Sequence, residues 1–260
     1  MFNAAADHYD DPANSFRERF GRRTVERLDL EQGMRVLDVA CGAGAATFPA
    51  AEAAGATGSV LGVDLAENQL DLARRKAAQL GLANVEFQVG DMRDLHLPDA
   101  AYDAVICAFG IFFVADMSAA VRELWRLVAP GGKLAIATWG PRQYEPLISV
   151  FWESVLAVRP DLQRKPNPWD SISNPDAVRD FLTGSGVERP DAVLEPGMHP
   201  LGSPRDWWAL VLGSRYRETV EALEDGDRER VQRTNHEYVQ TAGVREIETN
   251  VIYAVARKNR

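Results

Sequence analysis

Short apolar runs alternate with longer amphipathic stretches over the first half of the chain. Each apolar run is typical of a buried strand, and the stretches between them have the spacing of helices, closed by glycine or by a Pro-Gly-Gly turn. The predicted strands are 35–39, 60–63, 85–89, 103–108 and 133–138. The predicted helices are 47–54, 67–80 and 118–128. This alternation favours βαβ units and a parallel, doubly wound sheet in an α/β fold.

After Trp139 the pattern changes, because prolines and aromatic residues become dense and the alternation is lost. Five of the six tryptophans lie at or beyond this residue. The segment to about Thr241 predicts helices joined by loops, whereas 247–256 has the pattern of a strand. A late strand after a long insertion is typical of one compact domain with an added cap, and the charged helical stretch 14–28 could belong to the same cap.

The composition narrows the classes of function. The 260 residues include 29 Lys and Arg against 38 Asp and Glu, a net charge of −9 that argues against sequence-independent binding to nucleic acid. No apolar run reaches the roughly 18 residues that a membrane span needs. The start of the sequence lacks the basic and apolar regions of a signal peptide, and two cysteines are too few for a secreted disulfide scaffold. We therefore expect a cytoplasmic protein.

The strongest chemical signal is VLDVACGAG at 36–44, where a predicted strand passes into a helix. Its glycines let the backbone approach a ligand closely, and Asp64, which ends the next strand, can accept both hydroxyls of a ribose. A dinucleotide fingerprint needs a third glycine where Thr47 stands. In addition, Asp38 would repel a pyrophosphate and attract an ammonium or sulfonium group. The loop therefore points away from NAD and toward S-adenosylmethionine (SAM).

Taken in order, the motifs LDVACGAG, GVD, GDM, AVICAF and LVAPGGKL resemble those of the class I SAM-dependent methyltransferases, over about residues 30–140. The YD start, the APGG turn and the aromatic C-terminal region are similar to the small-molecule enzymes of ubiquinone and menaquinone biosynthesis. The resemblance implies a Rossmann-like, mostly parallel seven-stranded sheet with helices on both faces and a helical cap. The implied divisions are 1–30 for an N-terminal cap segment, 31–140 for the SAM-binding core, 141–243 for the substrate cap, and 244–260 for the last strand and tail.

The resemblance also assigns cofactor-binding residues, most of them at or just after the ends of the first four strands. They are Asp38, Ala40, Gly42 and Gly44 for the methionine end, Asp64 for the ribose, Leu65, Gln69, Asp91 and Met92 for the adenine, and Ala108 and Phe109 for the sulfonium. Glycine is usual at the position of Ala40, and alanine is tolerated there only if φ is negative.

The acceptor is less well defined. The loop after the fourth strand reads CAFGIF and lacks the Asn- or Asp-Pro-Pro-Tyr motif of enzymes that methylate nucleobases or glutamine. The aromatic region 139–216 could line a pocket for an apolar or aromatic molecule, or could instead be a tryptophan-rich core. His8, Tyr9 and His199 are candidate catalytic residues, for which a solvated or packed side chain is the competing interpretation. The four histidines do not have metal-ligand spacing, so we expect no metal.

The sequence thus predicts a methyltransferase that moves a methyl group from SAM to a small molecule at carbon, oxygen or nitrogen. Two alternatives remain open. One is a SAM-binding protein without methyl transfer, and the other is an NAD(P)-dependent oxidoreductase, which shares the βαβ architecture. The oligomeric state is not predicted.

Overall fold

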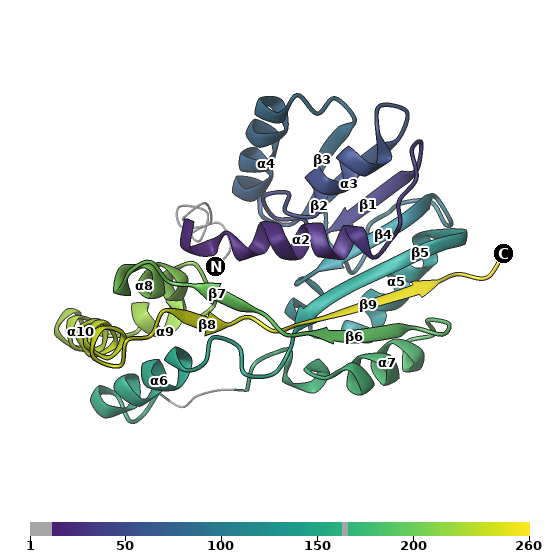
Figure 1. The fold of residues 1–260 in the computed structure, drawn as a ribbon. Helices are drawn as coiled ribbons and strands as arrows, with labels where there is room; N and C mark the ends of the chain where they lie inside the picture. Colours follow the sequence, from purple (N-terminus) through teal and green to yellow (C-terminus); the bar gives the residue numbers. More distant parts are fainter. Residues whose placement is uncertain (1–11, 163–165) are drawn as a thin grey trace. The chain divides into compact units, whose positions relative to one another are not determined.

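The computed structural model describes residues 12–162 and 166–260, which Figure 1 shows as a ribbon. The chain divides into two compact units. The larger unit comprises 17–139, 168–195 and 251–260, and the smaller unit comprises the described residues up to Phe16 together with 140–162, 166–167 and 196–250. These divisions differ from the predicted ones, because both the N-terminal segment and the predicted cap are shared between the units.

The larger unit is built on a seven-stranded sheet with the order β3-β2-β1-β4-β5-β9-β6. The strands are β1 (Arg35–Val39), β2 (Ser59–Asp64), β3 (Val85–Val89), β4 (Tyr102–Ala108), β5 (Val128–Trp139), β6 (Asp191–Glu195) and β9 (Val251–Arg257). Strands β1 to β5 pair in parallel, whereas β9 is antiparallel to both of its neighbours. The predicted mostly parallel, seven-stranded sheet is confirmed. Because β1 is flanked by β2 and β4, the strand order reverses there, which is where such sheets bind ligands.

Helices pack against strands along the whole width of this sheet. They are α2 (Phe16–Glu26), α3 (Thr47–Ala54), α4 (Glu67–Leu80), α5 (Met117–Leu127) and α7 (Pro175–Gly184), with short 3-10 turns η2 (Ile111–Phe113) and η3 (Asp170–Ile172). α3 and α4 pack on β1, β2 and β3, while α5 packs on β4 and β5 and α7 on β6 and β9. α4 ends at Gly81, which has the predicted left-handed conformation with φ 68°.

Two expectations about the sheet are wrong. β6 lies inside the segment predicted to be a helical insertion; its sequence DAVLE carries charges at both ends and mostly exposed positions, as suits an edge strand. The Pro-Gly-Gly stretch at 130–132, expected to be a turn between the helix 118–128 and the strand 133–138, instead forms part of β5. The pairing with β4 shifts from Tyr102–Val128 to Ala104–Lys133, so the extra residues form a bulge that Gly131 permits with φ 80°.

The smaller unit is mainly helical, as predicted. It contains η1 (Pro12–Asn14), α6 (Leu147–Val158), α8 (Pro204–Leu212), α9 (Arg217–Glu221) and α10 (Asp225–Thr241), and a two-stranded sheet of β7 (Met198–Pro200) and β8 (Glu246–Glu248) that the sequence did not predict. The predicted strand 247–256 is therefore two strands, one in each unit. Within the described part of the chain, no helix has the length and apolar character that a membrane crossing requires.

Candidate functional site

The loop after β1 folds as a series of left-handed turns. Gly42 and Gly44 have φ values of 52° and 91°, and a Cβ on Gly44 would lie 2.4 Å from the ring of Phe48. Both positions therefore need glycine, as the motif implies. The expectation of a negative φ at Ala40 is wrong, because its φ is 57°. The strained alanine is accommodated where the backbone passes Gly110, which has no side chain to meet its methyl group.

Asp38 lies in β1 beneath this loop, and its side chain is buried. One carboxylate oxygen accepts a hydrogen bond of 2.6 Å from the hydroxyl of Thr47, the first residue of α3. Burial raises the pKa of Asp38 to about 7, and the Asp64 carboxylate adds to the rise, while the Thr47 bond opposes it. A cation placed here would reverse that shift by favouring the charged form.

Thr47 is a functional candidate that the motifs did not predict. In the sequence it stands where a dinucleotide fingerprint has its third glycine, and in the structure its hydroxyl holds the buried carboxylate of Asp38 in place. Its position could have indicated this role, because a threonine hydroxyl at the start of the helix after the loop is close enough to hydrogen-bond to a residue of the preceding strand.

Asp64 connects the end of β2 to the glycine-rich loop by a hydrogen bond. Its Oδ2 accepts the Gly42 N–H at 2.8 Å, and its Oδ1 accepts the Ala66 N–H at 2.8 Å. A carboxylate offers about four lone-pair sites. Two acceptor positions are therefore still available for the hydroxyls of a ribose. Leu65, the next residue, is 63% exposed, as suits a residue predicted to pack on a flat ring.

The adenine-side candidates occupy different environments. Gln69 is buried within α4, and Met92 is buried after β3. The Asp91 carboxylate accepts hydrogen bonds of 2.9 Å from both the backbone N–H and the side chain of Arg93. These bonds lower the pKa of Asp91 and keep the carboxyl ionised. Asp91 is therefore a competent acceptor for an amino group, and its role toward adenine stays a prediction.

The predicted sulfonium-side residues begin an aromatic wall. Ala108 ends β4, and Phe109 follows it with φ 58° and a backbone N–H bonded to Ala137 at 2.8 Å. The ring of Phe109 stacks on Phe20 of α2 at 5.4 Å and lies 4.8 Å from Trp139. The wall continues through Trp169 and Phe112. Trp169 belongs to the aromatic region 139–216 that the sequence offers as a pocket lining or a core. Phe20 was not predicted for the site, since it is remote in sequence from the β4 loop.

Of the three predicted catalytic residues, one lies within the described part of the chain. His8 and Tyr9 fall outside the described residues. His199 lies in β7 of the smaller unit, is 5% exposed and packs against the ring of Phe16 at 5.1 Å, so it is a packed rather than a solvated histidine. Residues 12–162 and 166–260 contain no group of His, Cys, Asp and Glu side chains able to hold a metal ion.

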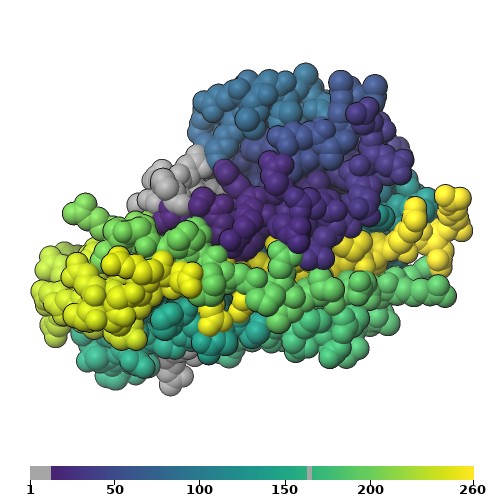
Figure 2. Space-filling model, in the orientation of Figure 1, coloured from purple at the N-terminus to yellow at the C-terminus, as the bar shows by residue number. Residues whose placement is uncertain are grey.

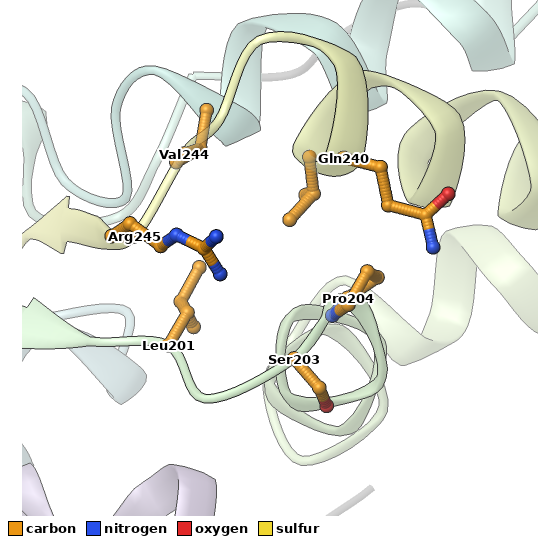
Figure 3. Close-up of a pocket in the computed structure, with 7 residues that line it drawn as sticks. Leu201, Ser203, Pro204, Gln240, Val244 and Arg245 are labelled. Atoms are coloured by element: carbon orange, nitrogen blue, oxygen red, sulfur yellow. The ribbon is translucent and has the colours of Figure 1, made fainter.

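The smaller unit has a cavity of its own, of about 160 Å³. Figure 3 shows it between the end of α10 and the start of α8, with the side chain of Arg245 pointing into it. Leu201, Val239 and Val244 form its apolar part. It contains none of the residues predicted from the motifs.

Comparisons with known proteins agree with the arrangement at the strand ends. The methyltransferase domain family matches residues 36–132. The chain is 35% identical over 138 residues to a demethylmenaquinone methyltransferase of Geobacillus sp. (strain WCH70), covering 52% of this chain and 59% of that protein. It is 31% identical over 203 residues to the aklanonic acid methyltransferase DauC of Streptomyces sp. (strain C5), covering 72% and 90% respectively. Thus the match spans little more than half of the first relative and most of the second.

A solved SAM-dependent methyltransferase from Aquifex aeolicus superimposes with a TM-score of 0.56 and 26% identity, over 72% of this chain and 88% of that one. The segment matched by the domain family begins in β1 and ends in β5. It therefore includes the glycine-rich loop, Asp64, Asp91 and Phe109, but neither α2 nor the smaller unit.

Proposed function

Because this chain belongs to the SAM-dependent methyltransferases, we propose that it transfers a methyl group from SAM to a small apolar or aromatic molecule by in-line displacement. The observation that carries the proposal is the joint geometry of the strand ends. The β1 loop has the two left-handed glycines, the buried Asp38 lies beneath it, and Asp64 contacts it directly. SAM, when bound, supplies a methyl group on a positively charged sulfur.

The residues of the chain fit that group. Asp64 keeps lone pairs for the ribose hydroxyls while it holds the N–H of Gly42. The buried Asp38 gives the methionine end a carboxylate partner whose ionised form a cation would stabilise. Holding the donor and the acceptor in a reactive geometry can contribute roughly 7–11 kcal/mol to the rate, so positioning is the main task of these residues.

The aromatic wall supports the class of acceptor. Phe20, Phe109, Trp139 and Trp169 form a continuous set of ring contacts within the larger unit, at the ends of β4 and β5. Such rings bind planar or apolar molecules and exclude water, which suits a reaction that neutralises a sulfonium charge. The two relatives are named for demethylmenaquinone and aklanonic acid, both small molecules. We propose that the methylated atom is a carbon, an oxygen or a nitrogen.

We also propose candidates for the catalytic base, the class of partner and the cellular location. A hydroxyl or acidic carbon acceptor would need a general base, and His8, Tyr9 and His199 remain our candidates for it. With a net charge of −9, we expect no nucleic-acid partner. Because two cysteines are too few for a secreted disulfide scaffold, we also propose a cytoplasmic location.

Calorimetric titration with S-adenosylhomocysteine (SAH) tests the first step of the proposal. We expect saturable binding, and an absence of binding at high micromolar ligand would refute the proposed function. Formation of SAH from SAM across a panel of small aromatic acceptors tests the second step. Binding without any turnover would favour a SAM-binding protein, whereas quenching of nicotinamide fluorescence would favour an oxidoreductase.

A further inference from the structure

Gly21 lies in the middle of α2, where glycine is among the least favourable residues for a helix. The structure gives a reason for it. A Cβ at Gly21 would lie 2.1 Å from the carbonyl oxygen of Ala45 and 2.7 Å from the amide nitrogen of Ala46, closer than the 3.0 Å below which real Cβ atoms are essentially never found. α2 therefore touches the backbone of the glycine-rich loop directly, and no flexible side chain lies between them that could move aside.

The residues on either side of Gly21 fix α2 in this position. Phe20 stacks on Phe109 at 5.4 Å, with 27° between the ring planes. One turn further along, Val25 belongs to the same buried cluster as Ala46. α2, purple in Figure 2, accordingly lies against the dark blue surface of the residues that follow the loop. The helix thus connects two segments predicted to contact the methionine end and the sulfonium, namely the β1 loop and the β4 end.

Backbone hydrogen bonds restrain the loop on either side of Ala45. Gly44 donates to Cys41 at 3.0 Å and accepts from Phe48 at 3.1 Å, and the carbonyl of Ala46 accepts from Ala50 at 3.0 Å. The close approach of Gly21 adds a backbone contact at Ala45 itself, between these bonds. Moving α2 outward would remove this contact and separate Phe20 from Phe109 at the same time.

We infer that Gly21 is a positioning residue for cofactor binding: backbone contact between α2 and Ala45 holds the glycine-rich loop in the conformation that accepts the methionine end of SAM. The inference rests on the proposed cofactor role of this loop. It also explains why a helix outside the segment matched by the domain family contributes to the site.

The test is Gly21→Ala, with Gly184→Ala as the matched control. Gly184 is the last helical residue of α7 in the larger unit, and a Cβ placed there would meet no atom within 4 Å beyond its chain neighbours and the backbone of its own helix. Hydrogen exchange of the amides of 42–46 is measured without ligand, and SAH affinity is measured by calorimetry. We expect Gly21→Ala to accelerate exchange in the loop at least tenfold relative to the β9 amides and to weaken SAH binding about tenfold. The control should change neither.

The two readouts separate the possible failures. If the wild-type protein binds no SAH, the proposed function fails, and loop exchange still tests the contact itself. If folded Gly21→Ala shows wild-type loop exchange, or a uniform acceleration with unchanged SAH affinity, the positioning role is wrong and Gly21 serves stability alone. Should Gly21→Ala not fold, Phe20→Leu loosens the same helix from Phe109, and it must likewise accelerate loop exchange for the inference to hold.

Discussion

The methyl group of Ala40 occupies the space that a side chain at Gly110 would need. A Cβ at Gly110 would lie 2.4 Å from the Cβ of Ala40 and 3.0 Å from the Sγ of Cys107. Ala40 adopts φ 57°, a conformation that glycine normally supplies. The β1 loop and the β4 end are therefore matched to each other, with the missing side chain on Gly110 compensating for the additional one on Ala40.

This relationship predicts coupled effects on stability. Gly110→Ala should lower the free energy of unfolding by roughly 1–3 kcal/mol, the usual cost of overpacking, because neither neighbour is a flexible chain end. Combining it with Ala40→Gly removes the closer clash and the strained φ, so the double variant should recover at least about 1 kcal/mol. Urea unfolding of the wild type, both single variants and the double variant measures the coupling.

Gly184→Ala is the control for this cycle as well, since open space surrounds that position and alanine favours a helix. Additivity of the two single changes to within about 0.3 kcal/mol would contradict the proposed match between Ala40 and Gly110.

Asp64→Ala should weaken SAH binding. The change removes the acceptor for the Gly42 N–H and the acceptor predicted for the ribose. Hydrogen bonds to a charged group contribute about 1.5–3 kcal/mol, so calorimetry should show a roughly 10- to 150-fold rise in Kd. Asp71→Ala is a suitable control, because Asp71 pairs with Arg74 on the exposed side of α4. A Kd within twofold of wild type for Asp64→Ala would show that this carboxylate does not hold the cofactor.

The buried Asp38 predicts a pH dependence of stability in the ligand-free protein. Its pKa is about 7 in the folded protein and close to 3.8 when unfolded, so the folded state binds the extra proton between these values. Stability should therefore fall as the pH rises from about 4 to about 7, by up to roughly 4 kcal/mol at 1.36 kcal/mol per pKa unit. Of the groups that face it, Cys41 and Cys107 stay neutral because burial raises the pKa of each thiol, and Asp64 contributes repulsion.

Unfolding of wild type and Asp38→Asn at several pH values checks this expectation. The amide cannot ionise, so Asp38→Asn should gain stability relative to wild type at pH 8 and show little difference at pH 4. If the stability of wild type instead rose between pH 4 and pH 7 relative to that of Asp38→Asn, the predicted direction of the pH dependence would be wrong. A bound cation should favour the carboxylate, so SAM binding at pH 7 should release a proton, which appears as a dependence of the calorimetric enthalpy on the buffer.

Elements with a clear local pattern were predictable from the sequence. The bounds 35–39, 47–54, 67–80 and 85–89 match β1, α3, α4 and β3, because apolar periodicity and glycine stops are encoded within each segment. The edge strand β6 was missed because its character depends on pairing with β9, not on its own residues.

The candidate site likewise has features that the sequence predicts and features that it does not. Topology alone places Asp64, Asp91 and Phe109 at one edge of the sheet, since parallel strands end together. The φ of Ala40 and the contact of Gly21 with Ala45 could not be predicted. Both features depend on how closely two backbone segments approach each other, although these segments are far apart in the sequence. The identity of a single residue does not indicate that distance.

A buried hydrogen-bond network in the smaller unit leads to the last prediction. Asn235 of α10 accepts from the Trp207 indole N–H at 2.9 Å and donates to the Ser154 hydroxyl at 2.9 Å, thereby connecting α8 and α6. Asn235→Ala leaves the indole N–H of the fully buried Trp207 without its acceptor. We expect the free energy of unfolding to fall by roughly 2–4 kcal/mol. Urea titration monitored by tryptophan fluorescence measures this loss.

Thr234→Ala, one residue away on the exposed side of α10, should change stability little and controls for helix propensity. Adding Trp207→Phe to Asn235→Ala removes the indole donor together with its acceptor. The double variant should therefore cost less than the sum of the two single changes, because no buried donor is left unpaired. Strictly additive costs would mean that Asn235 stabilises the unit by packing and that its bond to Trp207 contributes little.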